Sequence, residues 1–596
     1  MKPLTTVLLT AIVVVAVATV AYDVFISEPS LDYRLTILHN NSPESFLFNP
    51  GPGLEDFGGV ARFAEAVERE RHAGYSRQSR TDDKTRAGQV LLSSGNIFLP
   101  SKEFRAGREL GEFYDAQAID LMRYDAIALG AHEFDFGPDD LAEVISQVSE
   151  SRAPFLSANL DFSDEPLLQN LVEEGRIRKS VVVEKNGESI GIVGATTPEL
   201  RVVSSPENVR ILDVVAREVQ AEVDLLEASG VNKIILISHM QDIKADIALV
   251  SDLQGVDVVI AGGSDELLAN EGDLLIPGDD DVFGPYPLMA NDREGLPIPL
   301  ISTLGHYKYL GKLVVEFDSK GRALNVDPGS SGPIRIALGD KRMQKRVIDP
   351  QRAALNELRK PIGDTEVALD GRRSSVRYRE TNLGNLMADH ILWQAKQLAP
   401  TYGAPIPDVA IQNGGGIRND GVLAPGSVNL ADIIDIAPYV NDLTVVHEVD
   451  RVTFKTVLEN AVSRAAVGDS ELGTGRFAQI SGFSFVWSVS GNAQSLGSDC
   501  EMIVEGARIR EVVLDNGEAI VSRGRVITGT SLNVATPDFT AFGGDQYCFG
   551  NAKVTQLGPE YNLSLENYIK ESEGLNKLIT ASEYPEGGVG RIRQLP

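Results

Sequence analysis

Five short, mainly apolar runs, each followed within two residues by a polar or glycine residue, most constrain how this chain can fold. All lie in the first 260 residues: Val90–Leu92, Tyr124–Leu129, Ile190–Ala195, Ile234–Ile237 and Val256–Ile260. Continuous apolar runs are typical of strands that helices cover on both faces of a sheet. Ligands of such sheets bind where the strands end. The pattern therefore predicts an α/β domain whose functional residues directly follow its strands.

A histidine and an aspartate three residues apart follow the second of these runs, at His132 and Asp135. An aspartate that accepts a hydrogen bond from one ring nitrogen of a histidine fixes the tautomer and favours the protonated ring. We expect this pair to act as an acid catalyst. For an isolated His-x-x-Asp the alternative is an ordinary surface histidine, because so short a pattern often arises by chance.

The stretch from Gly130 to Asp135 resembles the Gly-Asn-His-Glu-Phe-Asp motif of the metallophosphoesterase domain in 5'-nucleotidases and 2',3'-cyclic phosphodiesterases. The resemblance covers nearly the whole chain. Tyr33–Asn41 is similar to the family's opening strand, and Asp56–Phe63 is similar to the start of the helix that follows it. The resemblance implies an N-terminal four-layer αββα sandwich that hydrolyses phosphoesters with the help of divalent metal ions.

Seven positions match the metal ligands of that family: Ser42, Glu44, Asn96, Ala131, His239, Gly263 and Asp265. Only His239 keeps the family's residue, although Glu44, Asn96 and Asp265 can also bind a metal. This oxygen-rich set favours Mn, Mg or Ca over Zn. Asn96 stands where the family has a carboxylate that bridges two ions, so we expect one ion or none. Ser42, Ala131 and Gly263 depart from the family pattern.

A second signal lies in the C-terminal half, where a strand enters a triple-glycine turn at Asp408–Arg418. Backbone without Cβ atoms lets a ligand approach closely and exposes N–H groups to an anion. Two arginines four residues apart, Arg373 and Arg377, can form a fork for phosphate, although such a pair alone is usually a solvated surface feature. Together with Glu380–Asn385, these segments resemble the nucleotide-binding domain of the same family.

The resemblance carries the family's substrate contacts onto nine residues: Arg373, Arg377, Asn413, Gly415, Arg418, Tyr439, Asn441, Phe539 and Asp545. The three arginines would hold phosphate or carboxylate-like groups of the ligand. Tyr439 and Phe539 would stack on the base, a contact that contributes about 1–3 kcal/mol per base. Asn441 would bond the base, and Asp545 the ribose hydroxyls. A small-molecule nucleotide is therefore the expected partner.

The N-terminal segment Leu4–Tyr22 carries no charge and is almost wholly apolar, which predicts an export signal. It is either a cleaved signal peptide or an uncleaved membrane anchor. We therefore expect a two-domain α/β protein with four regions: a signal or anchor at 1–25, a metallophosphoesterase-like domain at 26–340, a linker helix at 341–360 and a nucleotide-binding domain at 361–596.

Net charge and cysteine usage exclude other classes. The formal charge of −30 argues against a nucleic-acid partner, because that binding needs clustered Lys and Arg. The two cysteines, Cys500 and Cys548, could form one disulfide in an exported protein. A thiolate zinc site is excluded because there is no Cys-x-x-Cys pair. The sequence leaves the oligomeric state open.

These observations predict a metal-dependent phosphoric ester hydrolase of the 5'-nucleotidase or cyclic phosphodiesterase type. It would be periplasmic or extracellular, either free or anchored in the membrane, and would act on nucleotides or nucleotide sugars in nucleotide catabolism and phosphate scavenging. The alternative is a catalytically impaired nucleotide-binding or sensor protein of the same fold. A complete binding half beside a depleted metal half is what that alternative predicts.

Overall fold

The computed structural model describes residues 30–51, 53–78, 86–149, 153–264, 266–336, 339–465, 475–497 and 500–595. The chain divides into two compact units. The first contains the residues up to Leu99 and Gly111–Gln351, and the second contains Pro100–Leu110 and Arg352–Pro596. The expected export segment, 1–25, lies outside the described residues, and no helix within them is long and apolar enough to span a membrane.

The first unit is built on two sheets. One has the order β17-β16-β1-β2-β3-β4-β6, with β18 beside β16, and its strands β1, β2, β3, β4 and β6 run parallel. These strands are β1 (Leu31–Asn40), β2 (Arg86–Ser93), β3 (Ala126–Ala128), β4 (Phe155–Leu156), β6 (Ile177–Arg178), β16 (Tyr309–Asp318), β17 (Ala323–Val326) and β18 (Gly332–Arg335).

The other sheet has the order β14-β15-β11-β10-β8-β7, and its four inner strands run parallel. Its strands are β7 (Ser180–Lys185), β8 (Glu188–Thr196), β10 (Ile234–His239), β11 (Val258–Ile260), β14 (Leu288–Asn291) and β15 (Pro297–Ile301). Every apolar run identified in the sequence overlaps a parallel strand of one of the two sheets, because the residues of these strands are buried on both faces.

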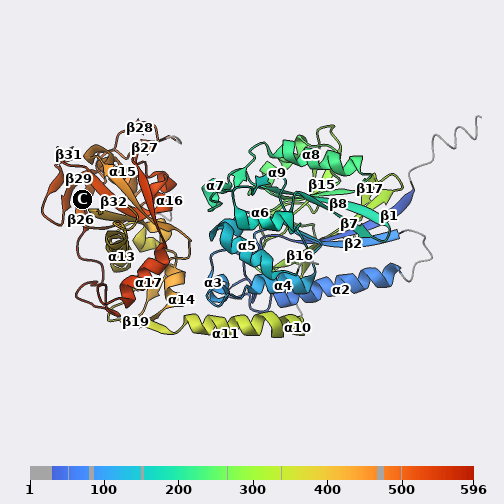
Figure 1. The fold of residues 1–596 in the computed structure, drawn as a ribbon, viewed down its shortest axis with the longest axis horizontal. Helices are drawn as coiled ribbons and strands as arrows, with labels where there is room; N and C mark the ends of the chain where they lie inside the picture. Colours follow the sequence, from blue (N-terminus) through green and yellow to red (C-terminus); the bar gives the residue numbers. More distant parts are fainter. Residues whose placement is uncertain are drawn as a thin grey trace, which may run out of the picture. The chain divides into compact units, whose positions relative to one another are not determined.

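Helices cover the outer face of each sheet (Figure 1). Figure 1 shows α8 (Val215–Ala228) and α9 (Ile243–Ser251) on one side of the unit and α2 (Val60–Gln78) and α4 (Tyr114–Met122) on the other. Residues of both sheets, such as Ile37 and Leu92 of the first and Ile192 and Ile235 of the second, join one buried cluster. The first unit is therefore a four-layer αββα sandwich.

Shorter elements complete this half of the chain. They are α3 (Lys102–Arg108), which falls in the second unit, η1 (His132–Phe134), α5 (Gly137–Gln147), β5 (Leu160–Asp161), α6 (Pro166–Glu173), α7 (Leu200–Val203), β9 (Arg210–Ile211), β12 (Leu267–Leu268) and β13 (Val282–Gly284). A continuous helical segment follows, formed by α10 (Lys341–Met343), the π-helical η2 (Gln344–Ile348) and α11 (Asp349–Leu358). The two units meet along the chain within α11.

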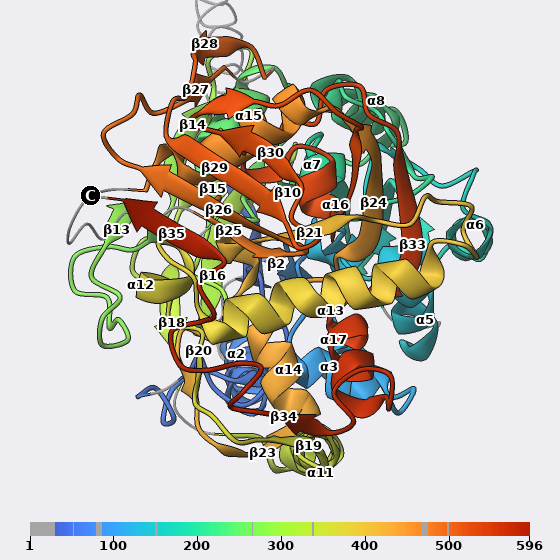
Figure 2. The same cartoon turned by 90° about the vertical axis from the view of Figure 1, so that its left-hand side faces the viewer.

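The second unit has a central mixed sheet of order β25-β21-β32-β24-β33. Figure 2 shows the long helix α13 (Asn382–Leu398) running along this sheet, and it packs on β21 and β25. A second five-stranded sheet has the order β31-β30-β29-β26-β35. The strands are β21 (Val409–Asn413), β24 (Asp442–Val449), β25 (Ala478–Ser481), β26 (Phe483–Ser488), β29 (Ile509–Leu514), β30 (Ala519–Ser522), β31 (Arg525–Val526), β32 (Leu532–Pro537), β33 (Val554–Glu560) and β35 (Ile592–Leu595).

The remaining elements of this unit are β19 (Pro361–Thr365), β20 (Leu369–Asp370), α12 (Arg373–Val376), η3 (Gly414–Gly416), β22 (Val422–Leu423), β23 (Gly426–Asn429), α14 (Leu430–Ile436), α15 (Arg451–Ser463), β27 (Ser495–Leu496), β28 (Met502–Val504), α16 (Asp538–Ala541), η4 (Gly544–Gln546), α17 (Tyr561–Lys570) and β34 (Leu578–Ile579). Cys500 and Cys548 form a disulfide, with their Cα atoms 6.0 Å apart. The pairing that the sequence left open is therefore confirmed.

Candidate functional site

Asn41 holds together the loops at one edge of the first unit. Its amide nitrogen donates to Ser94 Oγ at 3.0 Å and to the Ala261 carbonyl at 2.5 Å, and its oxygen accepts from the backbone and hydroxyl of Thr303 at 3.1 Å. These partners follow β2, β11 and β15, whereas Asn41 itself follows β1. One buried side chain therefore fixes the ends of strands from both sheets.

The catalytic pair expected from the sequence lies at this edge. His132 Nδ1 is 2.5 Å from Asp135 Oδ2, and Ser204 Oγ donates to Asp135 Oδ1 at 2.6 Å. Burial opposes the charged ring, but the hydrogen bond and charge of Asp135, with smaller contributions from Glu44 and Glu133, raise the pKa of His132 to about 9. The ring is therefore fixed in orientation and carries a proton at neutral pH.

Three of the four candidate metal ligands lie around this pair. The backbone N–H of His132 donates to Asn96 Oδ1 at 3.0 Å, and that of Glu44 donates to the Asn96 carbonyl at 2.9 Å. His239 Nδ1 lies 2.6 Å from the Ser94 carbonyl. The structure thus brings Glu44, Asn96 and His239 together with His132. The fourth candidate, Asp265, lies outside the described residues.

His239 offers an unused lone pair. Because Nδ1 donates to a carbonyl, Nε2 is the acceptor, and it is buried with no hydrogen-bond partner among the described residues. Burial lowers the pKa of His239 to about 4, so the ring is neutral. A Cβ on Gly263 would come within 2.7 Å of Nε2, and one on Gly130 within 2.5 Å of Asn96 Oδ1. Two glycines therefore leave no side chain against this nitrogen and amide oxygen, which are the types of atom that bind a cation.

The other oxygens at this site have protein partners or carry no charge. Glu44 Oε2 lies 2.9 Å from His306 Nε2, and Ser42 contributes only a buried hydroxyl. Ala131 has no ligating atom. Within the described ranges, no three His, Cys, Asp or Glu side chains gather where they could hold a metal ion. The residues present fit a single ion and not a centre of two ions, because no carboxylate stands at the bridging position.

The arginines of the second unit form a cluster of like charges. Burial lowers the pKa of Arg377, and the charges of Arg373 and Arg418 lower it further, whereas Asp545 and Tyr439 oppose this shift. The Arg418 guanidinium lies 5.4 Å from the centre of the Tyr439 ring. Guanidinium groups held close together without an equal number of carboxylates are typical of a site for an anionic ligand.

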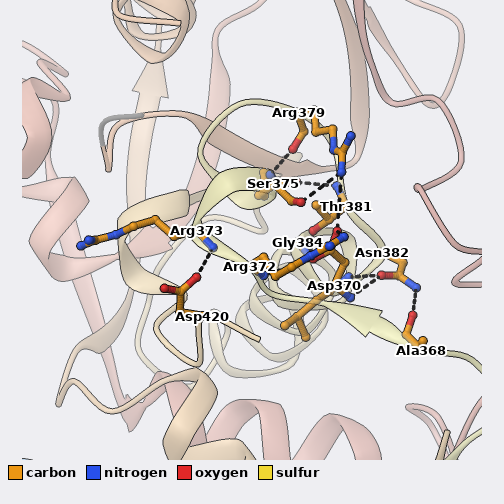
Figure 3. Close-up of polar contacts among 12 residues, drawn as sticks. Ala368, Asp370, Arg372, Arg373, Ser375, Arg379, Thr381, Asn382, Gly384 and Asp420 are labelled. Atoms are coloured by element: carbon orange, nitrogen blue, oxygen red, sulfur yellow. Dashed lines mark hydrogen bonds and ion pairs between the residues drawn. The ribbon is translucent and has the colours of Figure 1, made fainter. Parts of the chain in front are cut away.

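Figure 3 shows that neighbouring arginines differ in their contacts with carboxylates. Asp370 binds Arg372 at 2.8 Å and lies 3.8 Å from Arg379, so these two charges are compensated within the unit. Asp420 holds only the backbone N–H of Arg373, at 2.7 Å, and the Arg373 side chain points away from it. The Arg372 side chain is thus held in an ion pair with Asp370, whereas the side chain of Arg373, the expected phosphate ligand, points away from Asp420.

The remaining expected substrate contacts lie at the end of β21 and on short helical turns and loops of the same unit. Asn413 Nδ2 donates to Asp545 Oδ2, and Asn441 Nδ2 donates to Asp538 Oδ1, each at 2.8 Å. A Cβ on Gly415 would lie 2.8 Å from Gly475 Cα, so only glycine fits there. The rings of Tyr439 and Phe539 are 42% and 44% exposed, which leaves both available for stacking. The geometry is that of an open site with anion-binding, aromatic and hydroxyl-accepting groups.

Comparison with known proteins identifies the family. Residues 361–551 match the model of the 5'-nucleotidase C-terminal domain. The human 5'-nucleotidase is 30% identical over 473 residues, which cover 77% of this chain and 76% of the human protein. The chain belongs to the 5'-nucleotidase family. The resemblance expected from the sequence is thereby confirmed, and so is the two-domain α/β fold.

Two further relatives agree with this membership of the 5'-nucleotidase family. The crystal structure of a 5'-nucleotidase precursor from Thermus thermophilus is 28% identical, with a TM-score of 0.60, and the match covers 94% of this chain and 99% of that one. The trifunctional nucleotide phosphoesterase YfkN of Bacillus subtilis is 28% identical over 518 residues. These residues cover 82% of this chain, which spans only 32% of the length of YfkN.

Two residues of this 5'-nucleotidase family member were missed from the sequence. Glu133 is buried and accepts backbone N–H groups of Asn96, Ile97 and Gly130 at 2.6–3.1 Å, which ties the loop after β2 to the loop after β3. Burial raises the pKa of Glu133 to about 7, although these N–H groups oppose the shift. His306 faces Glu44. The position of Glu133 inside the His132 motif was a signal, whereas nothing around His306 marked it.

Proposed function

We propose that this protein is an exported 5'-nucleotidase-like phosphoester hydrolase that acts on nucleotides or nucleotide sugars. The observation that supports the proposal most is the cluster in the second unit, where Arg377, Arg373 and Arg418 lie near Tyr439 and Asp545. Positive charge for a phosphate, an aromatic face for a base and a carboxylate for ribose hydroxyls together match the chemical groups of a nucleotide.

We propose one divalent cation in the first unit, with Mn, Mg or Ca more suitable than Zn. His239 and Asn96 would hold it, and Glu44 and Asp265 are further candidate ligands. Such an ion polarises a phosphoryl oxygen when it is bound. Support comes from the buried Nε2 of His239, which has no partner among the described residues, and from Gly263 and Gly130, where a Cβ would press on Nε2 and on Asn96 Oδ1.

His132 would stabilise charge on the transferring phosphoryl group or on the leaving oxygen. Its Nδ1 is held by Asp135, so Nε2 is the atom that would donate a hydrogen bond to the substrate. Ser204 holds the second oxygen of Asp135 and limits rotation of the carboxylate. Asn96 binds the backbone of His132 and so fixes the position of the ring relative to His239.

Export is part of the proposal. It is supported by the apolar segment Leu4–Tyr22 and by the Cys500–Cys548 disulfide, because disulfides persist mainly in oxidising compartments. A periplasmic or extracellular location fits both, with either a cleaved signal or a membrane anchor at the N-terminus.

A product screen combined with metal analysis tests this proposal. AMP, UDP-glucose and 2',3'-cyclic AMP are offered to the purified full chain with Mn, Mg, Ca or Zn, and release of the matching products is followed by chromatography: inorganic phosphate and adenosine, UMP and glucose 1-phosphate, and an adenosine monophosphate, respectively. We expect release that is greater with Mn or Mg than with Zn, and a loss of about 10²–10⁴-fold in His132→Ala with nucleotide affinity retained. Nucleotide binding without release under every metal would contradict hydrolysis and support the alternative, a nucleotide-binding or sensor protein.

A further inference from the structure

Glu44 is engaged by a residue 262 positions away in the sequence. His306 Nε2 lies 2.9 Å from Glu44 Oε2. The His306 ring also stacks on Phe46, with ring centres 3.7 Å apart and planes inclined by 20°. One carboxylate oxygen is thus taken up by an imidazole N–H, and the imidazole itself is held between a carboxylate and an aromatic face.

The backbone around this pair is held in an unfavourable conformation. Ser42, Glu44, His306 and Tyr307 all have positive φ, between 35° and 62°, although none is glycine. This left-handed region is unfavourable for residues that carry a Cβ. The His306 N–H donates to the Ser42 carbonyl at 2.9 Å, and a Cβ on Gly305 would lie 2.5 Å from that carbonyl oxygen. Close packing of two loops therefore maintains the geometry that brings His306 to Glu44.

The charges available at the site explain why the contact between His306 and Glu44 matters for metal binding. Two divalent ions need several carboxylates nearby, but Ser42 and Asn96 are neutral and Ala131 has no ligating group. Glu44 would then be a half-buried carboxylate, with a side chain that is 18% exposed, without enough other ligands to share a cation with. A donor N–H from His306 satisfies Glu44 without a metal ion, because a charge-assisted hydrogen bond compensates a carboxylate.

We propose that His306 takes the place of a metal ion at Glu44, so that this chain holds its single cation on the His239 side of the site. The inference rests on the proposed metal-assisted function and specifies its metal site. Glu44, a candidate ligand by sequence, is then a partner of His306 and becomes a metal ligand only when His306 releases it.

A restored variant makes the competition measurable. Ser42→Asp, Asn96→Asp and Ala131→Asn together return the family's residues at three metal positions and create room for an additional ion. In this background, His306→Phe keeps a ring to stack on Phe46 but removes the donor, whereas His306→Gln keeps an N–H donor. Binding of Mn²⁺ to the metal-free full-length variants is measured by calorimetry and by elemental analysis after dialysis.

We expect His306→Phe to tighten binding of the additional Mn²⁺ by about 10–100-fold relative to the restored variant, and His306→Gln to leave it unchanged. Equal affinities in all three proteins, tightening by both substitutions, or no additional ion in any of them would each overturn the inference. Circular dichroism confirms that each variant is folded. If the His306→Phe variant does not fold, His306→Asn replaces it. Asparagine tolerates positive φ and is too short to reach Glu44.

Phosphate release is measured separately on the unmodified chain. Absence of release from every nucleotide would contradict the proposed hydrolase activity, yet a tenfold effect of His306→Phe on Mn²⁺ affinity would still support the role of His306. Phosphate release together with no effect of His306→Phe on Mn²⁺ affinity would support the hydrolase activity and overturn the role of His306. The two failures are therefore distinguishable.

Discussion

At the scale of single residues, identical residue types in this protein do different work because their neighbours differ. Arg372 and Arg373 are adjacent, but Asp370 compensates the first, while the side chain of the second points away from Asp420 (Figure 3). Arg418 lies over Tyr439. Such differences identify which arginine can bind a phosphate, and they supply matched controls for mutagenesis.

Nucleotide affinity should depend on Tyr439, Phe539 and Arg418 but not on Arg372. We expect Tyr439→Ala with Phe539→Ala to weaken AMP binding by at least tenfold, because stacking contributes about 1–3 kcal/mol per base. Arg418→Ala should weaken AMP binding and spare adenosine, which has no phosphate. Calorimetric titration checks both ligands, with Arg372→Ala as the control. Unaltered AMP affinity in the double variant would remove the proposed base site.

Asp246 should make the stability of the first unit depend on pH. Burial, with a smaller contribution from Glu266, raises the pKa of Asp246 from 3.8 to about 8. The folded state therefore binds more protons than the unfolded state between these values, so stability is greatest below about pH 4 and falls as the pH rises through 8. We expect Asp246→Asn to be more stable than the parent at pH 8.5, by the order of 2 kcal/mol, and to lose most of this advantage at pH 4, close to the pKa of the carboxyl in the unfolded state.

Urea unfolding followed by circular dichroism at both pH values measures this difference. Asp252→Asn is the control, since Asp252 is an exposed carboxylate at the end of the same helix α9. An Asp246→Asn variant with the parent's dependence on pH would contradict a raised pKa at Asp246.

At the scale of elements, part of the motif that suggests a nucleotide site serves to build helix α13. Thr381 Oγ1 caps the helix by accepting the Gly384 N–H at 2.9 Å. Asn382 binds the Asp370 N–H and the Ala368 carbonyl, and Glu380 accepts the backbone N–H groups of Val589, Gly590 and Ile592. These side chains place the strand and turn that carry the arginines relative to α13.

Loss of the cap should therefore affect stability and not recognition. We expect Thr381→Ala to lower the free energy of unfolding of the second unit by about 1 kcal/mol and Thr381→Ser to preserve it. Tryptophan fluorescence during urea unfolding reports this unit, because both tryptophans, Trp393 and Trp487, lie in it. AMP affinity of the folded variants should match the parent. A large affinity loss in Thr381→Ala that Thr381→Ser does not share would show instead that the hydroxyl contacts the ligand.

At the scale of the whole molecule, the two sets of functional residues belong to different compact units. Asn413, Arg418, Tyr439 and Asp545 lie in the second unit, and His132 lies in the first. Each unit has its own buried clusters of apolar residues. The residues proposed for nucleotide binding and the residue proposed for catalysis therefore lie in units with separate cores.

AMP should stabilise the second unit selectively. At 100 times its dissociation constant a ligand adds about 2.7 kcal/mol to the unit that binds it. We expect AMP to raise the free energy of unfolding of the second unit, measured by tryptophan fluorescence, by this amount. The stability of the first unit, measured by hydrogen exchange of β1 and β10, should not change. The disulfide is kept oxidised throughout. If AMP protected β1 and β10 from hydrogen exchange as much as it stabilised the second unit, the main nucleotide contacts would lie in the first unit.

The amino-acid sequence by itself determined the strands and the order of the motifs, because burial on both faces leaves a continuous apolar run such as Ile234–Ile237. It also determined the neutral residues at Ser42, Asn96 and Ala131. Only the tertiary structure decided that Asn96 Oδ1 accepts from His132, that Glu133 joins two loops and that His306 engages Glu44. The physical reason is that periodicity and propensity are local, whereas Glu44 and His306 meet only because strands of two different sheets end at the same edge.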